Sequence, residues 1–496
     1  MSDATASTGQ QPHQRIGLVL GPVLALLAWW LLPAGDGDGG GLSAAGRATA
    51  AVGVWMATWW MTEALPLPAT ALLPVVAFPL LGVAPVADTL RPYANDIIFL
   101  FMGGFMLGLA MQRHGLHKRL ALWIILLVGT QPLRLVAGFM LATAFLSMWI
   151  SNTAATIILL PVGVSVVAML RREGSGVPAD AAKAFATCLM LAIAYAASIG
   201  GSGTLIGSPP NLVVASFLGS RYGCEITMLD WMRIGLPVVA VFLPLAWFYL
   251  TRLAHPIRIQ ALPGGRQPIA DELAGLGPMQ WPERAVAVVF GSAAVAWILR
   301  PQIVAWTGLG GLTDAVIAVA APLLLFMLPD RRGGRVLDWE TAVRLPWGIL
   351  LLFGGGLSLA MAVSLHGVDA FIAGGLSGLA GMPTLLVVFA VAVMVVFLTE
   401  LTSNTAIATA FVPIVAAVAL GLGVDPMPLL IAVGLGASYA FMLPVATPPN
   451  AIVFGSGAVT VGQMVRAGIV LNLVGITLVT LAVSLLPVAG CPGATP

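Results

Sequence analysis

The stretch LSMWISNTAATIILLP, residues 146–161, carries the polar tripeptide Ser-Asn-Thr at 151–153 in the middle of an apolar run. Polar groups inside a membrane need hydrogen-bond partners or a function, because lipid supplies no partners. The tripeptide recurs at 403–405, an offset of 252 residues (403 − 151), and again lies in an apolar run. The two copies predict a chain built from two related halves.

Composition indicates the class of protein. The chain of 496 residues is 59% hydrophobic and only 8% charged, whereas soluble domains carry about 25% charged residues. A soluble core could not bury this much apolar surface, so we predict an all-α polytopic membrane protein. The net charge of +2, without a basic cluster, predicts no nucleic-acid partner.

Apolar runs separated by Gly/Pro-rich joints predict about 11 transmembrane helices plus two re-entrant hairpins. The hairpins, at 133–170 and 383–423, carry the tripeptides near their middle. The expected spans are 16–33, 46–62, 66–82, 96–112, 181–218, 230–251, 284–300, 312–329, 346–363, 427–456 and 467–487.

A hydrophilic joint at 252–283 separates two similar halves. The expected domains are a polar cytoplasmic tail at 1–15, a first span and loop at 16–45, repeat 1 at 46–251, a cytoplasmic linker at 252–283, repeat 2 at 284–487 and a tail at 488–496. The first span resembles a signal peptide, but its amino-terminal flank is weakly basic and no clear small-x-small cleavage site follows. We therefore expect it to be retained.

Further matches support the repeat. The pair His114-Gly115 recurs as His366-Gly367 at the same offset, and YAASIGGSGTLIGSPPN (195–211) parallels YAFMLPVATPPN (439–450). Internal repeats of this kind are typical of secondary transporters. Five crossings and one hairpin in each half predict that the second half is inverted relative to the first.

Basic residues predict the orientation. With a cytoplasmic amino terminus and hairpins that enter and leave on one side, most of the 22 Lys and Arg residues lie inside, as the positive-inside rule favours. The residues expected outside are Arg47, Arg91, Arg221, Arg233 and Arg300. We expect a multi-pass protein of the cell inner (plasma) membrane, in contact with membrane lipid.

The tripeptides have a physical explanation as hairpin tips. Ser, Asn and Thr are favourable N-cap residues, and the free amides and dipole at a helix start attract anions. Two opposed tips suit an anion with two separated negative groups, while the Asn oxygen with nearby carbonyls suits a hard cation. The alternative is that the tripeptides are only polar caps, and that the Pro/Gly segments only kink helices.

These motifs carry a family resemblance. WISNTAATIILLPV, TSNTAIATAFVPI, SIGGSGTLIGSPPN and LPVATPPNAIVFGSG closely resemble the divalent anion/sodium symporter family, over nearly the whole chain. The resemblance implies a homodimer, with a scaffold domain and a transport domain that moves by an elevator-type motion. It implies di- or tricarboxylate substrates, or sulfate in some branches.

The resemblance also implies site residues. The substrate would be bound by Ser151, Asn152, Thr153, Ser202, Ser403, Asn404, Thr405, Thr447 and Pro448. One sodium site would be formed by Ser147, Ser151, Asn152 and Gly201. The other would be formed by Thr399, Thr402, Asn404 and the Ala446 carbonyl, with Thr402 expected to supply only backbone.

Charge favours cation coupling independently of the resemblance. Neither tripeptide and neither PPN segment contains Lys or Arg, and an unpaired buried ion costs several kcal/mol. The charge deficit therefore predicts co-bound cations. Together with the resemblance, it leads us to expect Na⁺ as the coupling ion, no organic cofactor, and sodium-driven transport of a small dicarboxylate of the succinate, malate or fumarate class. The alternatives are a sodium-independent or proton-coupled di- or tricarboxylate exchanger and a sulfate transporter.

Two other residues bear on function. Glu400, near the second tripeptide, either binds backbone amides as a structural partner or carries a proton. Ser438 would be the nucleophile of an intramembrane hydrolase, but no His lies in an adjacent predicted span to act as its base. We therefore expect a transporter and not an enzyme.

Overall fold

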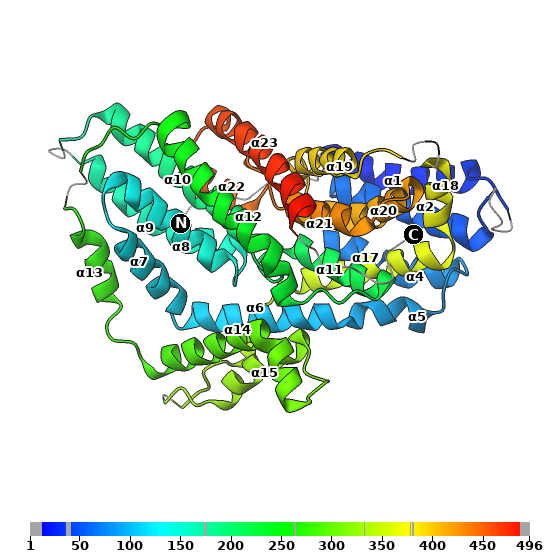
Figure 1. The fold of residues 1–496 in the computed structure, drawn as a ribbon, viewed down its shortest axis with the longest axis horizontal. Helices are drawn as coiled ribbons and strands as arrows, with labels where there is room; N and C mark the ends of the chain where they lie inside the picture. The colour runs from blue at the N-terminus through cyan, green and yellow to red at the C-terminus, as the bar shows by residue number, and fades with distance from the viewer. Residues whose placement is uncertain are drawn as a thin grey trace.

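The computed structural model describes residues 12–35, 41–172, 176–261, 264–331, 333–376, 378 and 381–486. These ranges fold into helices and contain no β-strand. The helices form an elongated molecule, with α9 and α10 toward one end and α2 and α18 toward the other (Figure 1). Residues 1–11 and 488–496 of the predicted tails lie outside the described ranges, whereas residues 12–15 begin the first helix.

Nine helices of the described chain are long and apolar enough to cross a membrane. They are α1 (Pro12–Leu31), α6 (Asp96–Arg113), α9 (Asn152–Leu170), α10 (Ala179–Gly201), α12 with its π-helical extension (Met228–Phe248, Tyr249–Ala254), α14 (Trp281–Thr307), α17 (Trp347–Leu365), α20 (Asn404–Leu422) and α23 (Val461–Leu485). The prediction of a helical protein with many membrane spans is confirmed at this level.

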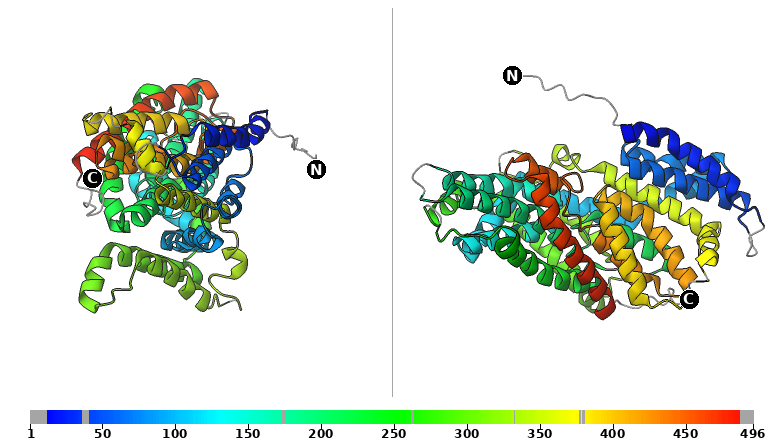
Figure 2. Two further views of the ribbon diagram at one scale, coloured as in Figure 1. Left: turned by 90° about the vertical axis from the view of Figure 1, so that its right-hand side faces the viewer. Right: turned by 90° about the horizontal axis from the view of Figure 1, so that it is seen from above.

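The remaining helices are shorter or less apolar. They are α2 (Ala44–Thr62), α3 (Leu67–Thr70), α4 (Leu73–Leu80), α5 (Val86–Leu90), the 3₁₀ helix η1 (Arg91–Ala94), α7 (Leu116–Val128), α8 (Pro132–Ser147), α11 (Pro209–Tyr222), α13 (Gln267–Gly275), α15 (Asp314–Met327), α16 (Trp339–Ala342), α18 (Val368–Leu376), α19 (Thr384–Thr399), α21 (Pro426–Gly436) and α22 (Pro448–Gly455). Helices α1 and α2 pack together at one side of the bundle (Figure 2).

Each tripeptide lies at a break between two helices, as expected for a hairpin tip. Helices α8 and α19 have 16 residues each, and α9 and α20 have 19 each. A helix of 16 residues is about 24 Å long, shorter than the hydrocarbon core of about 30 Å. The first arm of each hairpin is therefore too short to span the membrane unless the bilayer thins around it.

The predicted spans 181–218 and 427–456 are each interrupted. The PPN segments begin α11 and α22, where proline is favourable because the first amides of a helix have no internal partner. Asn211 Nδ2 donates to the carbonyls of Gly201 (3.1 Å) and Thr204 (2.8 Å). Asn450 Nδ2 donates to those of Ala440 (3.1 Å) and Leu443 (3.0 Å). The same residue type thus closes both breaks.

The repeated His-Gly pair ends one helix and starts the next in both halves. Gly115 and Gly367 have φ of 75° and 66°, which glycine adopts without steric cost. The His114 Nε2 lies 2.6 Å from the Val336 carbonyl oxygen, and the His366 Nε2 lies 2.8 Å from that of Val83. Each imidazole therefore ties its own half to a loop of the other.

Close backbone packing also recurs between the halves. A Cβ added to Gly103 of α6 would lie 2.1 Å from the Ala318 carbonyl oxygen of α15. One added to Gly355 of α17, 252 residues later, would lie 2.3 Å from the Ala71 carbonyl oxygen. The helix pairs therefore meet at a separation that only glycine permits.

Candidate functional site

A cavity of about 850 Å³ lies between the two hairpin tips, and both tripeptides line it. Four helices begin at this cavity: α9 and α20 at the tripeptides, and α11 and α22 at the PPN segments. Helix N-termini carry partial positive charge, so their convergence makes the cavity favourable for an anion.

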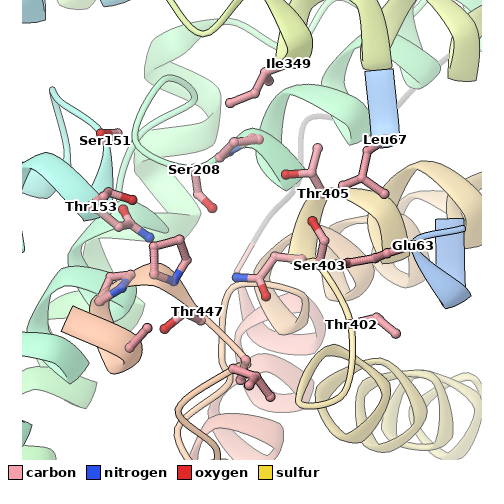
Figure 3. A pocket seen from close by; sticks show the side chains of 18 of the residues that line it. Glu63, Leu67, Ser151, Thr153, Ser208, Ile349, Thr402, Ser403, Thr405 and Thr447 are labelled. Carbon is pink, nitrogen blue, oxygen red and sulfur yellow. The ribbon is translucent and has the colours of Figure 1, made fainter. Parts of the chain in front are cut away.

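The two tripeptides face each other across the cavity. Ser151 and Thr153 lie on one side, Ser403 and Thr405 on the other, and Thr447 approaches from a third direction (Figure 3). The predicted substrate-binding residues found in the lining are Ser151, Asn152, Thr153, Ser403, Asn404, Thr405, Thr447 and Pro448. The structure therefore brings together residues that lie about half the chain apart in sequence.

The two tips differ in their free amides. The Ser151 hydroxyl accepts from the Ala154 amide (3.2 Å), whereas the Ser403 side chain caps no amide of α20. The start of α20 therefore keeps one more amide for a ligand than the start of α9 does. This difference makes the second tip the stronger donor side of the cavity.

Oxygen atoms cluster behind the first tip. The Ser147 Oγ lies 2.6 Å from Asn152 Oδ1 and 2.6 Å from the Ala197 carbonyl oxygen. A hydroxyl has a single proton and can donate to only one of these oxygens. The second oxygen–oxygen contact then has no proton between its two atoms, and a bound cation would stabilise it. Hydroxyl, amide and carbonyl oxygens are the ligands that hard cations prefer.

Gly201 completes this oxygen cluster. A Cβ at this position would lie 2.5 Å from Asn152 Oδ1 and 3.1 Å from the Gly207 carbonyl oxygen. Only glycine leaves this space open beside the amide. The predicted sodium residues Ser147, Asn152 and Gly201 therefore fit a small cation.

The second tip repeats the cluster. The Thr399 Oγ1 lies 2.6 Å from Asn404 Oδ1 and 3.1 Å from the Ala437 carbonyl oxygen. Thr399 is fully buried, as is Ser147 at the equivalent position of the first tip. The residues of the second predicted sodium site thus have the same donor chemistry as those of the first.

Other predicted sodium residues lie at the cavity edge. Thr402 and Ala446 line the cavity. The Thr402 hydroxyl donates to the Leu398 carbonyl oxygen of α19 (3.2 Å), so its side chain is engaged by the preceding helix. That Thr402 contributes to a sodium site through its backbone stays a prediction.

Ser202 is placed differently from the other predicted substrate residues. It is buried outside the cavity lining, its hydroxyl donates to the Ile199 carbonyl oxygen (2.7 Å), and it lies 2.8 Å from the Tyr439 hydroxyl. These contacts join the break after α10 to the break after α21. Ser202 is therefore not among the described residues that line this cavity.

Glu400 lies behind the second tip and not in the cavity. Its Oε1 accepts from the amides of Phe441 (2.7 Å) and Met442 (2.9 Å), and its Oε2 accepts from the Leu443 amide (3.0 Å). The Asn472 Nδ2 of α23 donates a fourth hydrogen bond (2.7 Å). The sequence left two roles open for Glu400, a structural partner of backbone amides and a proton carrier. This geometry matches the first role.

The sequence did not identify several cavity and ligand groups. The carbonyls of Ala197 and Ala437 carry no side-chain signature, although both lie beside the predicted helix breaks. Ser208 lines the cavity just before its PPN segment, a position that the repeat could have indicated. Among the described residues, the lining contains no Lys or Arg, and Glu63 and His13 are its only ionisable residues.

Comparisons with known proteins agree with this arrangement. A family model for the sodium:sulfate symporter transmembrane region matches residues 13–487. The sodium-dependent dicarboxylate transporter SdcS of Staphylococcus saprophyticus is 42% identical over 485 residues, which cover 96% of this chain and 92% of that protein. The protein of the same name from Staphylococcus aureus strain USA300 is 41% identical over 475 residues, covering 95% and 90%.

A solved structure shares the fold. The crystal structure of the Alcanivorax borkumensis YdaH transporter matches with a TM-score of 0.55 at 14% sequence identity, and the match covers 95% of this chain and 98% of that one. At this identity the likeness concerns the arrangement of helices and not the choice of substrate.

Proposed function

The chain belongs to the sodium:sulfate symporter family, and on this premise we propose that it is a secondary active transporter that carries a dicarboxylate together with sodium ions. It is a transporter and not an enzyme, as the family and the relatives are. The dicarboxylate transporters of two staphylococci, similar along nearly their whole length, support the substrate class and the coupling ion.

The observation that carries the proposal is the pair of opposed tripeptide tips at one cavity. Each tip offers hydroxyls, an amide side chain and the start of a helix. A dicarboxylate such as succinate has two carboxylates separated by a short apolar linker, so each carboxylate can face one tip. A ligand with a single anionic group would use only one of the two.

Charge explains the need for sodium. The described cavity lining has no Lys or Arg, and a helix terminus contributes about 0.3–2 kcal/mol to an anion. Burial of an unpaired ion costs several kcal/mol. Two sodium ions, one beside each tip, neutralise a dianion, and any further ion makes transport electrogenic.

We place the sodium ions in the two oxygen clusters. Ser147, Asn152 and Gly201 hold the first, and Thr399, Asn404 and the Ala446 carbonyl hold the second, with the Ala197 and Ala437 carbonyls as additional oxygen ligands. Neutral oxygen ligands give a site that releases its ion readily, which a transport cycle needs.

The movement that we propose follows from the repeats. The two halves are inverted repeats, and the hairpins with the broken helices form a transport domain that moves in an elevator-type motion against a scaffold containing α6 and α17. The equivalent contacts at Gly103 and Gly355 and at His114 and His366 support this division. The protein acts as a homodimer in the plasma membrane, with its amino terminus in the cytoplasm.

Uptake into proteoliposomes tests the proposed function. Labelled succinate should accumulate against its gradient when sodium is higher outside, and should not when choline replaces sodium. Exchange with internal succinate that is indifferent to sodium would assign the chain to an exchanger. If sulfate competes with uptake and four-carbon acids do not, the chain would be a sulfate transporter.

A further inference from the structure

A second cavity lies at the other end of the helices that line the first. Helices α11 and α17 pack against each other, and their amino-terminal ends, at Pro209 and Ile349, line the substrate cavity. Their carboxyl-terminal ends, at Arg221 and Leu365, line a cavity of about 550 Å³. From Pro209 to Arg221, α11 rises about 18 Å, so the two cavities lie well apart along one seam.

Apolar side chains close the seam between the two cavities. A void of about 10 Å³ lies there, among Val213 and Phe217 of α11, Phe353 and Leu357 of α17, and Val412 of α20. Such a void is at or below the size that holds one water molecule. The seam is thus open at the substrate cavity, closed in the middle and open again at the second cavity, as alternating access requires.

The polar character of the second cavity is cationic. Arg91 and Arg221 line it, together with Asn95, Ser220 and Ser364, and no Asp or Glu is among its described lining residues. Arg221 is already engaged, because its Nη2 lies 2.8 Å from Asp369 Oδ2. Its charge is therefore largely compensated.

Arg91 is the free charge of this cavity. Four arginines that the positive-inside argument places on the same face have partners: Arg47 lies over the Trp29 ring, Arg221 pairs with Asp369, Arg233 with Asp230 and Arg300 with Glu225. The Arg91 guanidinium is exposed and has no ion pair, hydrogen bond or aromatic contact within the described residues. A free cation in a cavity whose described lining has no acidic residue creates a positive potential that favours an anion.

We propose that this second cavity is an anion-binding vestibule on the outer side, where Arg91 attracts the dicarboxylate before the seam opens to it. The inference rests on the proposed function. Arg91 recruits the substrate from the outer side, from which the closed seam blocks access to the substrate cavity in this structure. One positive charge in a partly enclosed cavity raises the local concentration of a dianion and the rate of its association, an effect that salt screens.

The test compares Arg91→Gln with wild type in sodium-driven succinate uptake, measured from each side of oriented proteoliposomes of neutral lipid. At about 0.01 M ionic strength, where the Debye length is about 30 Å, KM for succinate from the outer side should rise about threefold to tenfold. The difference should shrink at about 1 M salt, where the Debye length is about 3 Å. The maximal rate and the KM from the inner side should stay unchanged, and Arg91→Lys should restore the outer KM.

Arg233→Gln is the matched control. It removes a guanidinium from the same predicted face, but one that is paired with Asp230 at 3.0 Å and lies outside the cavity lining. Its outer KM should equal that of wild type. An equal rise in both variants would overturn the vestibule, because the effect would then come from the general charge of the face.

An anionic lipid headgroup carries the same kind of negative charge as a dicarboxylate. A second arm of the experiment therefore distinguishes the two ligands. If Arg91→Gln changes uptake only when anionic lipid is added to the liposomes, the cavity binds lipid and the substrate vestibule is refuted. An unchanged outer KM at low ionic strength, in a wild type that transports succinate, refutes the vestibule alone. A wild type that transports no dicarboxylate refutes the proposed function, and the vestibule with it.

Discussion

Asn152 and Asn404 combine two roles at the scale of single residues. Each is the first residue of a helix at the cavity, and each turns its carboxamide oxygen to within 2.6 Å of a buried hydroxyl, that of Ser147 or Thr399. In the proposed function, the backbone amide at the cavity binds the anion and the side-chain oxygen behind it binds the cation. We propose that this adjacency couples sodium to substrate.

We expect Asn152→Ala and Asn404→Ala each to lower sodium-driven succinate uptake at least about tenfold, because each removes an oxygen ligand worth more than about 1.4 kcal/mol. Uptake and gel filtration measure activity and folding together. Ser165→Ala is the control, since it deletes an exposed hydroxyl of α9 that bonds only to its own helix. Near wild-type uptake in both asparagine variants would remove the tips from the mechanism.

Gly201→Ala should raise the sodium concentration for half-maximal uptake about tenfold, since the new Cβ would lie 2.5 Å from Asn152 Oδ1 and displace that ligand by steric overlap. Sodium titration of uptake at fixed succinate measures the effect. Gly219→Ala adds the same group to α11 with its nearest neighbour at 3.8 Å, and should leave the titration unchanged. Identical titrations for Gly201→Ala and wild type would place the ion elsewhere.

The break between α21 and α22 shows how an element is held at the scale of secondary structure. Its backbone amides at Phe441, Met442 and Leu443 have lost their helical partners and donate instead to Glu400. The carboxylate is buried, and the amides that surround it supply the compensation that burial of a charge requires. Glu400 therefore positions the segment that carries Ala446 and Thr447 to the cavity.

Glu400→Gln should destabilise the protein and weaken sodium binding, because one amide oxygen replaces two carboxylate oxygens and the new NH₂ faces backbone donors. Leaving buried donors unsatisfied costs about 1–3 kcal/mol. Thermal unfolding in detergent and sodium titration of uptake measure both effects. Asn472→Ala removes one of the four hydrogen-bond donors to Glu400, so it should destabilise the protein less than Glu400→Gln does. Unchanged stability with a lost pH dependence of uptake would favour the proton-carrier role instead.

At the scale of the whole molecule, the two related halves meet at one cavity, and the sequence predicted the parts that carry side-chain signatures. The tripeptides, the PPN segments and the His-Gly pairs recur in order, so their placement at helix breaks could be predicted. Helices α7 and α18 were missed, because they have only 13 and 9 residues and begin beside charged side chains. Both follow a His-Gly pair, a signal that could have found them.

Other features had no signal in the sequence. The carbonyls that we propose as sodium ligands, those of Ala197 and Ala437, depend on where a helix ends and not on residue type. Ser202 was expected at the substrate but bonds within the packed breaks, because α10 continues to Gly201 whereas α21 ends at Gly436. The second cavity and the free charge at Arg91 follow from tertiary packing alone.

The central claim is that the dicarboxylate and sodium bind together because each compensates the charge of the other at the paired tips. Calorimetric titration of the purified protein with succinate, in sodium chloride and in equimolar choline chloride, tests it most directly. The account predicts succinate binding at least about tenfold tighter in sodium, with sodium affinity raised by the same factor when succinate is bound. Equal succinate affinity in the two salts would contradict it.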